Sequence, residues 1–234
     1  MVAAAVTARV VIDIWSDVMC PWCVIGYKHL EQALAELDGE IAATLRWQPF
    51  ELNPDMPPQG EPRDAHIARK YGRSPEQFAE ISNRISTLAA QAGFDMGWQG
   101  EGHPPPAMMW NTRRAHILLR WALETHGPDA QTRLKLALFR AHFQQRRNVS
   151  DPVVLLDIAA EAGFDRGGVE AALADDGLDG KVAWEEDRAF QMNITGVPAM
   201  VVNGRMLIPG AQDPATYAAI LRQAVERAGD GASA

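Results

Sequence analysis

The chain has 234 residues, 47% of them hydrophobic, which is enough for one large domain or two small ones with a real core. The formal net charge of -8 argues against a phosphate-binding surface, so we expect no nucleic-acid partner. No apolar run approaches the roughly 20 residues that cross a bilayer, and the apolar N-terminus has no basic region of the kind that begins a secretory signal. We therefore expect a cytoplasmic protein with no membrane partner.

The first part of the chain predicts a strand, a helix and a second strand. Residues 10–15 are mostly β-branched and apolar, as in a strand that is buried on both faces. Cys20 and Cys23 follow directly, and apolar residues then recur at steps of four and three as far as Leu37, which predicts an amphipathic helix. Residues 45–52 predict the second strand. The two cysteines therefore lie at the first crossover of a predicted parallel βαβ unit.

The middle of the chain is predicted to be helical. Residues 53–62 are rich in proline, which breaks regular structure and marks a boundary. After them, Ser74, Pro75 and Gln77 combine an N-cap serine, a proline at the first helical position and a glutamine three residues after the cap. They predict a helix that ends near residue 91. Further helices are predicted at residues 111–125, 130–144 and 153–162.

Strand character returns near the C-terminal end. Residues 199–202 and 205–208 flank Asn203 and Gly204, the dipeptide that most strongly signals a two-residue hairpin. A cap at Asp213 then predicts a final helix.

These elements predict an α/β protein with a thioredoxin fold that is interrupted by a large all-helical insertion. Residues 1–53 and 183–234 would form the thioredoxin-like domain, which is discontinuous in the sequence, and residues 54–182 would form the insertion. The insertion could cover a substrate groove or the surface of a homodimer, and the sequence leaves both alternatives open.

The Cys-Pro-Trp-Cys motif at the start of the first helix predicts redox chemistry. Disulfide exchange needs a thiolate on one cysteine and a second cysteine close enough to displace the mixed disulfide. Cys20 would lie at the positive end of the helix dipole, so we expect its pKa to fall below the free value of about 8.5, into a range of roughly 3.5 to 7.5. Cys23, one turn further along, is predicted to be the resolving thiol.

The two residues between the cysteines are candidate substrate contacts. Pro21 suits the first turn of a helix because it has no N–H to donate. Trp22 offers an aromatic surface beside the sulfur, and a tryptophan that only shields the site is an equal alternative.

Asp13 is a candidate proton relay. It lies in the otherwise apolar first strand, seven residues before Cys20, where a buried carboxyl group could carry a proton to or from Cys23. The alternative is a partly solvated strand residue with no role in the chemistry.

A zinc half-site and a pair of structural cysteines are the alternatives to a redox pair. Zinc usually needs four ligands, and the sequence has no second Cys-x-x-Cys and no close histidine pair, so we expect no metal. Two cysteines three positions apart also cannot join distant parts of the chain. The motif therefore favours a redox-active pair that needs no prosthetic cofactor.

Four sets of residues connect the chain with a known family. They are residues 17–26, residues 50–57, Asn111-Thr112 with Ala115-His116, and Gly196-Val197-Pro198 with Gly210-Ala211. The chain resembles the FrnE-like branch of the DsbA superfamily nearly from end to end. The resemblance implies a DsbA-like protein-disulfide oxidoreductase or isomerase that acts on a disulfide or thiol and uses a cellular thiol reductant. It also implies that Pro198 forms a cis peptide facing the cysteines, where it would keep metal off the thiols, and that the backbone of Val197 pairs with substrate.

Two other functions stay open. The same superfamily includes kappa-class glutathione transferases and 2-hydroxychromene-2-carboxylate isomerases, which use a single serine or similar group in place of the cysteine pair. The presence of both cysteines favours redox chemistry over a glutathione-dependent isomerase or transferase, and glutathione is then a candidate reductant or co-substrate. The other candidate is a non-catalytic holdase whose helical insertion offers an apolar groove.

Overall fold

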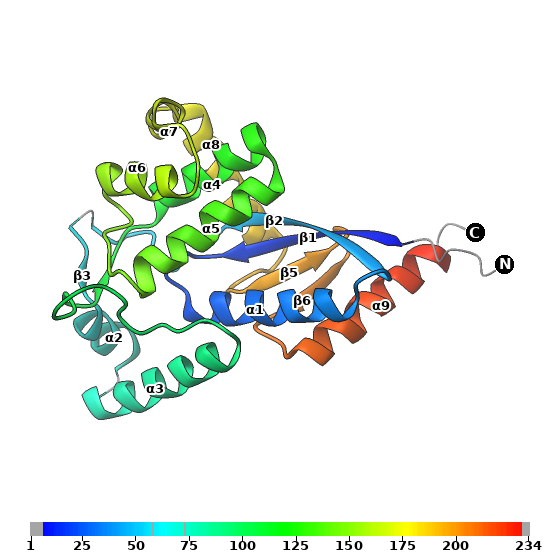
Figure 1. Ribbon diagram of the computed structural model, residues 1–234, viewed down its shortest axis with the longest axis horizontal. Helices are drawn as coiled ribbons and strands as arrows, with labels where there is room; N and C mark the ends of the chain where they lie inside the picture. The colour runs from blue at the N-terminus through cyan, green and yellow to red at the C-terminus, as the bar shows by residue number, and fades with distance from the viewer. Residues whose placement is uncertain (1–6, 58, 73, 231–234) are drawn as a thin grey trace.

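The computed structural model describes residues 7–57, 59–72 and 74–230, and it is built around a four-stranded sheet (Figure 1). The strands, in the order in which they lie side by side, are β2 (Ile41–Pro49), β1 (Ala8–Ser16), β5 (Ala199–Val202) and β6 (Met206–Pro209). β2 runs parallel to β1, whereas β5 and β6 are antiparallel to their neighbours. A strand–helix–strand unit and a C-terminal hairpin therefore share one sheet.

Two helices cover one face of this sheet. α1 (Pro21–Glu36) and α9 (Pro214–Asp230) lie side by side, in blue and red in Figure 1. The apolar cluster on this side contains Ile12 and Ile14 of β1 and both cysteines. The fold therefore buries the start of α1 against the middle of the sheet.

The opposite face of the sheet packs against α8 (Asp176–Gln191). Trp15 of β1 and Val201 of β5 form a separate apolar cluster with Ala189 of α8. Successive side chains of a strand point to opposite faces, so β1 sends its side chains alternately toward α1 and toward α8. This alternation decides which strand residues can reach the cysteines.

The helical insertion packs on β2 and has an apolar core of its own. Its elements are β3 (Glu61–Pro62), α2 (Arg63–Tyr71), α3 (Pro75–Gln91), β4 (Met108–Met109), α4 (Arg113–His126), α5 (Pro128–Phe143), α6 (Pro152–Glu161) and α7 (Arg166–Leu173). Figure 1 shows α4 to α7 grouped on one side of the sheet, apart from α2 and α3. α4 and α5 contact β2, and α3 contacts α1. Within the described ranges, no helix is both long and apolar enough to cross a membrane.

The structure confirms the α/β fold with its helical insertion and corrects three details. The second strand spans Ile41–Pro49 instead of residues 45–52, because β2 is an edge strand whose first half is partly exposed and lacks the apolar pattern of a buried strand. α8 runs unbroken across residues 182 and 183, so the predicted domain boundary falls inside a helix. The short helix α2 was not predicted, since its nine residues are mostly polar and it follows directly on the proline-rich segment.

Candidate active site

Cys20 and Cys23 lie where β1 passes into α1. Cys20 is the N-cap residue of the helix, with extended backbone angles, and Pro21 occupies the first helical position. The Sγ atom of Cys20 accepts a hydrogen bond from the backbone N–H of Cys23 over 3.3 Å, and both cysteines are free thiols. One of the N–H groups that the first helical turn leaves without a partner is therefore directed at the sulfur.

The loop that leads into β5 lies against the cysteines. The Val197–Pro198 peptide bond is cis, as the family resemblance implies, and the Cys20 thiol donates a hydrogen bond to the Val197 carbonyl oxygen over 3.7 Å. Gly26 of α1 allows this approach, because a Cβ atom at that position would lie 3.0 Å from Cγ of Pro198. The structure therefore brings both predicted substrate-binding residues of this loop to the start of α1.

Both thiols are shielded from solvent, with 2% of Cys20 and 1% of Cys23 exposed. Burial raises the pKa of Cys20 well above its ordinary value and the neighbouring Cys23 thiol raises it further, whereas the hydrogen bond from the Cys23 N–H lowers it. The expected fall in the Cys20 pKa is therefore wrong for this closed, reduced arrangement. The loss of solvation outweighs the favourable position at the helix N-terminus.

Trp22 differs sharply from the cysteines that flank it, because 41% of it is exposed. Pro21, beside it, is partly buried in the first turn of α1. The Trp22 ring is therefore a large apolar surface that a bound substrate can reach without any movement of the core.

Asp13 lies on the wrong face of β1 for a proton relay. Its carboxylate accepts two hydrogen bonds from the Arg46 guanidinium, over 2.8 and 2.7 Å, and one from the Gln48 amide over 2.8 Å. Ile12 and Ile14, its neighbours in the strand, are the residues that pack in the cluster with the cysteines. The predicted relay role is therefore wrong: strand alternation turns Asp13 away from Cys23 and gives it a structural role beside β2.

Asp17 is a site residue that the sequence interpretation missed. Its fully buried carboxylate accepts hydrogen bonds from the N–H groups of Met19, over 3.1 Å, and Leu52, over 2.8 Å. Burial raises its pKa, while these two bonds lower it. Asp17 thus ties the turn before Cys20 to the segment after β2, and only the tertiary fold reveals this link.

Lys135 of α5 is the second residue that was missed. It is fully buried, and its Nζ atom donates a hydrogen bond to the Ser16 carbonyl oxygen over 3.1 Å. The same atom lies 5.2 Å from the centroid of the Trp47 ring and 5.0 Å from that of Phe139. A lysine among the apolar residues of the predicted helix at 130–144 was the available signal, since lysine is almost never fully buried unless it is paired.

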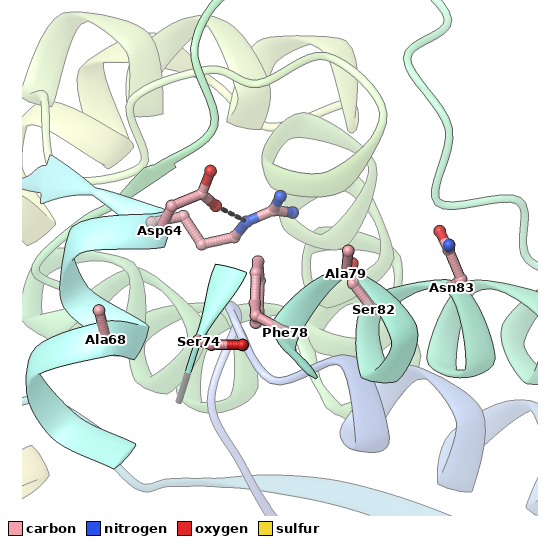
Figure 2. Close-up of a pocket in the computed structure, with 8 residues that line it drawn as sticks. Asp64, Ala68, Ser74, Phe78, Ala79, Ser82 and Asn83 are labelled. Carbon is pink, nitrogen blue, oxygen red and sulfur yellow. Dashed lines mark hydrogen bonds and ion pairs between the residues drawn. The ribbon is translucent and has the colours of Figure 1, made fainter. Parts of the chain in front are cut away.

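A hollow elsewhere on the molecule is separate from the thiols. It has a volume of about 270 Å³ and lies between α2 and α3 (Figure 2). The Arg63 guanidinium packs over the Phe78 ring there. None of its lining residues is a predicted site residue. Among the described side chains, no group of three or more His, Cys, Asp or Glu is placed to hold a metal ion.

Comparisons with known proteins agree on a family. The model of the DSBA-like thioredoxin domain matches residues 11–222. The uncharacterized protein YwbO of Bacillus subtilis is 28% identical over 202 residues, which cover 86% of this chain and 90% of YwbO. The crystal structure of a probable DsbA oxidoreductase from Streptomyces coelicolor is similar with a TM-score of 0.79 and 30% identity, over 92% of this chain and 89% of that one.

More distant structures share the fold alone. The cytosolic disulfide reductase DsbM from Pseudomonas aeruginosa, solved with glutathione, has a TM-score of 0.57 at 19% identity, over 92% of this chain and 99% of that one. A 2-hydroxychromene-2-carboxylate isomerase has a TM-score of 0.59 at 16% identity, over 95% of this chain and 98% of that one. Membership of the FrnE-like branch stays a prediction. The family match spans most of the sequence, and the chain belongs to the family of DSBA-like thioredoxin domains.

Proposed function

We propose that this protein is a thiol-disulfide oxidoreductase in which Cys20 is the nucleophile and Cys23 is the resolving thiol. The observation that carries the proposal is the position of the Cys20 sulfur. It lies at the N-terminus of α1, accepts the Cys23 N–H and contacts the Val197 carbonyl oxygen beside the cis Pro198 peptide. A thiolate at this point is stabilised by the helix N-terminus as soon as it is formed.

The proposed reaction has two exchange steps. The Cys20 thiolate attacks one sulfur of a substrate disulfide, the substrate S–S bond breaks, and the electron pair leaves with the second substrate sulfur. Cys23 then attacks Cys20, which releases the first substrate sulfur as a thiol and leaves a Cys20–Cys23 disulfide. The same two steps in reverse oxidise a substrate dithiol.

The proposed substrate is a protein or small-molecule disulfide bound in an extended conformation. Such a segment would pair with the backbone of Val197, whose carbonyl oxygen already contacts the Cys20 sulfur, and would rest on Pro21, Pro198 and the exposed ring of Trp22. Glutathione is the proposed reductant of the resulting Cys20–Cys23 disulfide, in a cytoplasmic setting. DsbM, which shares this fold, is a cytosolic disulfide reductase whose structure was solved with glutathione.

The test is the reduction of insulin disulfides by dithiothreitol, with the intact protein compared with the Cys20→Ser and Cys23→Ser variants. We expect the intact protein to accelerate reduction, Cys20→Ser to be inactive, and Cys23→Ser to accumulate a mixed disulfide that mass spectrometry identifies. The redox equilibrium of the intact protein with glutathione is measured in the same samples.

A protein that neither turns over disulfides nor forms the Cys20–Cys23 bond contradicts the proposal. A glutathione-dependent isomerase or transferase would then move to first place, and its activity would survive Cys23→Ala. A holdase would still bind unfolded clients after the loss of both cysteines.

A further inference from the structure

Lys135 is a fully buried cation whose Nζ atom lies next to the end of β1, close to the turn that leads to the cysteines. Within the part of the chain that the structure describes, the Ser16 carbonyl oxygen is the hydrogen-bond partner of Lys135 Nζ, and no carboxylate oxygen lies within 4 Å of this atom. A charged group removed from water without a close counter-ion costs several kcal/mol. The carboxyl group that faces Lys135 is that of Asp17, and burial raises the pKa of this group and so disfavours its charged form.

The two thiols are the other groups near Lys135 that can carry a negative charge. Ser16 is the last residue of β1, in the turn that leads to Cys20. The rings that pack against the ammonium group, Trp47 and Phe139, belong to the same apolar cluster as both cysteines. In this water-poor interior, charges act on one another much more strongly than at the surface.

Four other titratable groups face Lys135 from the elements around it. They are Asp17 on the turn after β1, Cys20 and Cys23 at the start of α1, and His116 on α4. Burial lowers the pKa of Lys135 to about 8, and interactions with Cys23, Asp17 and Cys20 oppose this fall. Burial and the charge of Lys135 both lower the pKa of His116, so its imidazole is neutral. Lys135 itself remains mostly protonated at neutral pH.

We propose that Lys135 is the positioning residue that holds a positive charge for the Cys23 thiolate when Cys23 resolves the mixed disulfide. This inference rests on the function proposed above. In the resolving step the Cys23 sulfur forms a bond to Cys20, the bond between Cys20 and the substrate sulfur breaks, and the electron pair leaves with the substrate. The proton that Cys23 gives up ends on the substrate thiol. The charge comes from α5, which lies outside the strand–helix–strand unit that carries the cysteines.

The two thiol steps can be observed separately with dithiobis(nitrobenzoate), a small aromatic disulfide. Attack by Cys20 releases one coloured thionitrobenzoate, and attack by Cys23 on the resulting mixed disulfide releases a second. Stopped-flow absorbance with an excess of the reagent gives both rates over a range of pH. The variants are Lys135→Met, which removes the charge, and Lys135→Gln, which removes the charge but keeps a donor for the Ser16 carbonyl oxygen.

We expect the second release to slow about tenfold at neutral pH in both variants, and its pH midpoint to move upward, with a smaller change in the first release. Lys28→Met is the matched control, since Lys28 lies on α1 soon after Cys23 but makes a surface ion pair with Glu31. Circular dichroism verifies that each variant is folded, and Lys135→Gln serves if Lys135→Met does not fold.

A second release that keeps the wild-type rate and pH midpoint in a folded charge-free variant overturns the inference. If Lys28→Met slows the second release by the same factor, the inference is overturned as well, because the loss of any nearby positive charge would then have this effect. A wild-type protein that gives no second release contradicts the proposed function itself, and the inference falls with it.

Discussion

The Cys20 sulfur accepts a hydrogen bond from the backbone N–H of Cys23 over 3.3 Å, which favours a thiolate on Cys20. Only 2% of Cys20 is exposed, and this loss of solvation disfavours the thiolate. These effects oppose each other, and burial wins: the pKa of Cys20 is raised. The reduced, closed site therefore holds Cys20 as a thiol at neutral pH. Substrate that brings polar groups or water to the sulfur would shift the balance toward the thiolate.

The raised pKa of Cys20 predicts that the reduced protein loses stability at alkaline pH. An unfolded cysteine ionises near 8.5, whereas folded Cys20 ionises only at higher pH, so the contribution is complete below about 8.5 and is lost as the pH rises toward the folded value. Within that window the free energy of unfolding should fall by about 1.4 kcal/mol per pH unit. Urea unfolding under reducing conditions at about pH 7.5 and about pH 9.5 measures this loss.

Cys20→Ser is the control for this alkaline loss, because serine does not ionise in the range. The variant should retain more of its stability than the wild type between the two pH values. Parallel losses in the two proteins would show that other groups carry the effect and that Cys20 is not held as a thiol.

The exposure of Trp22 predicts that its replacement weakens substrate binding and leaves the stability of the fold unchanged. Its ring is 41% exposed beside two buried thiols, so Trp22→Ala should change the free energy of unfolding by less than about 0.5 kcal/mol. Loss of an aromatic contact of about 1 kcal/mol should raise KM for a peptide disulfide about fivefold, with kcat nearly unchanged. Trp184→Ala is the matched control, since Trp184 is 62% exposed on α8. Equal KM values for the wild type and Trp22→Ala would instead mean that Trp22 only shields the site.

Local patterns in the sequence were sufficient for much of the fold. The Ser74 side chain accepts a hydrogen bond from the Gln77 backbone N–H, and the Gln77 side chain accepts one from the Ser74 backbone N–H, as the capping pattern predicts. Asn203 and Gly204 both have positive φ angles, 51° and 68°, which is the turn geometry that joins two strands through this dipeptide. Each of these features depends on residues that are adjacent in the chain, so no tertiary information was needed.

The parts of the site that could not be predicted depend on packing between distant segments. Lys135 reaches the turn before Cys20 only because α5 packs on β2. The sequence also does not show on which face of the sheet Asp13 lies. β1 is apolar on both sides, so its alternation does not tell which side meets α1. Burial of Cys20, and hence its raised pKa, follows from the same packing and not from the motif.

Asp13→Asn tests the correction to the proton-relay prediction. The change weakens the paired hydrogen bonds from Arg46, and we expect the free energy of unfolding to fall by about 1–2 kcal/mol. Because the carboxylate lies on the face of β1 away from the cysteines, the second release of thionitrobenzoate should keep its wild-type rate and pH midpoint. A slower release with a shifted midpoint, in protein that is still folded, would restore Asp13 as the relay.

The burial of Glu51 predicts that the protein loses stability as the pH rises from mildly acidic to mildly alkaline. Its side chain is 7% exposed, it faces Glu186, and Arg113 lies 3.6 Å away and is shared with Glu186. Burial and the charge of Glu186 raise the pKa of Glu51 to about 8. An unfolded glutamate ionises near 4.3, so this contribution is complete below about 4.3 and is lost as the pH rises toward about 8.

Glu51→Gln imitates the neutral form and should remove this dependence. Relative to the wild type, the variant should gain at least about 1 kcal/mol of unfolding free energy between about pH 5 and about pH 8.5, as measured by urea unfolding. Glu226→Gln, at an exposed position on α9, should leave the wild-type slope unchanged. If Glu51→Gln and the wild type lose stability in parallel, Glu51 is ionised over the whole pH range. Arg113 then balances the charges of both Glu51 and Glu186.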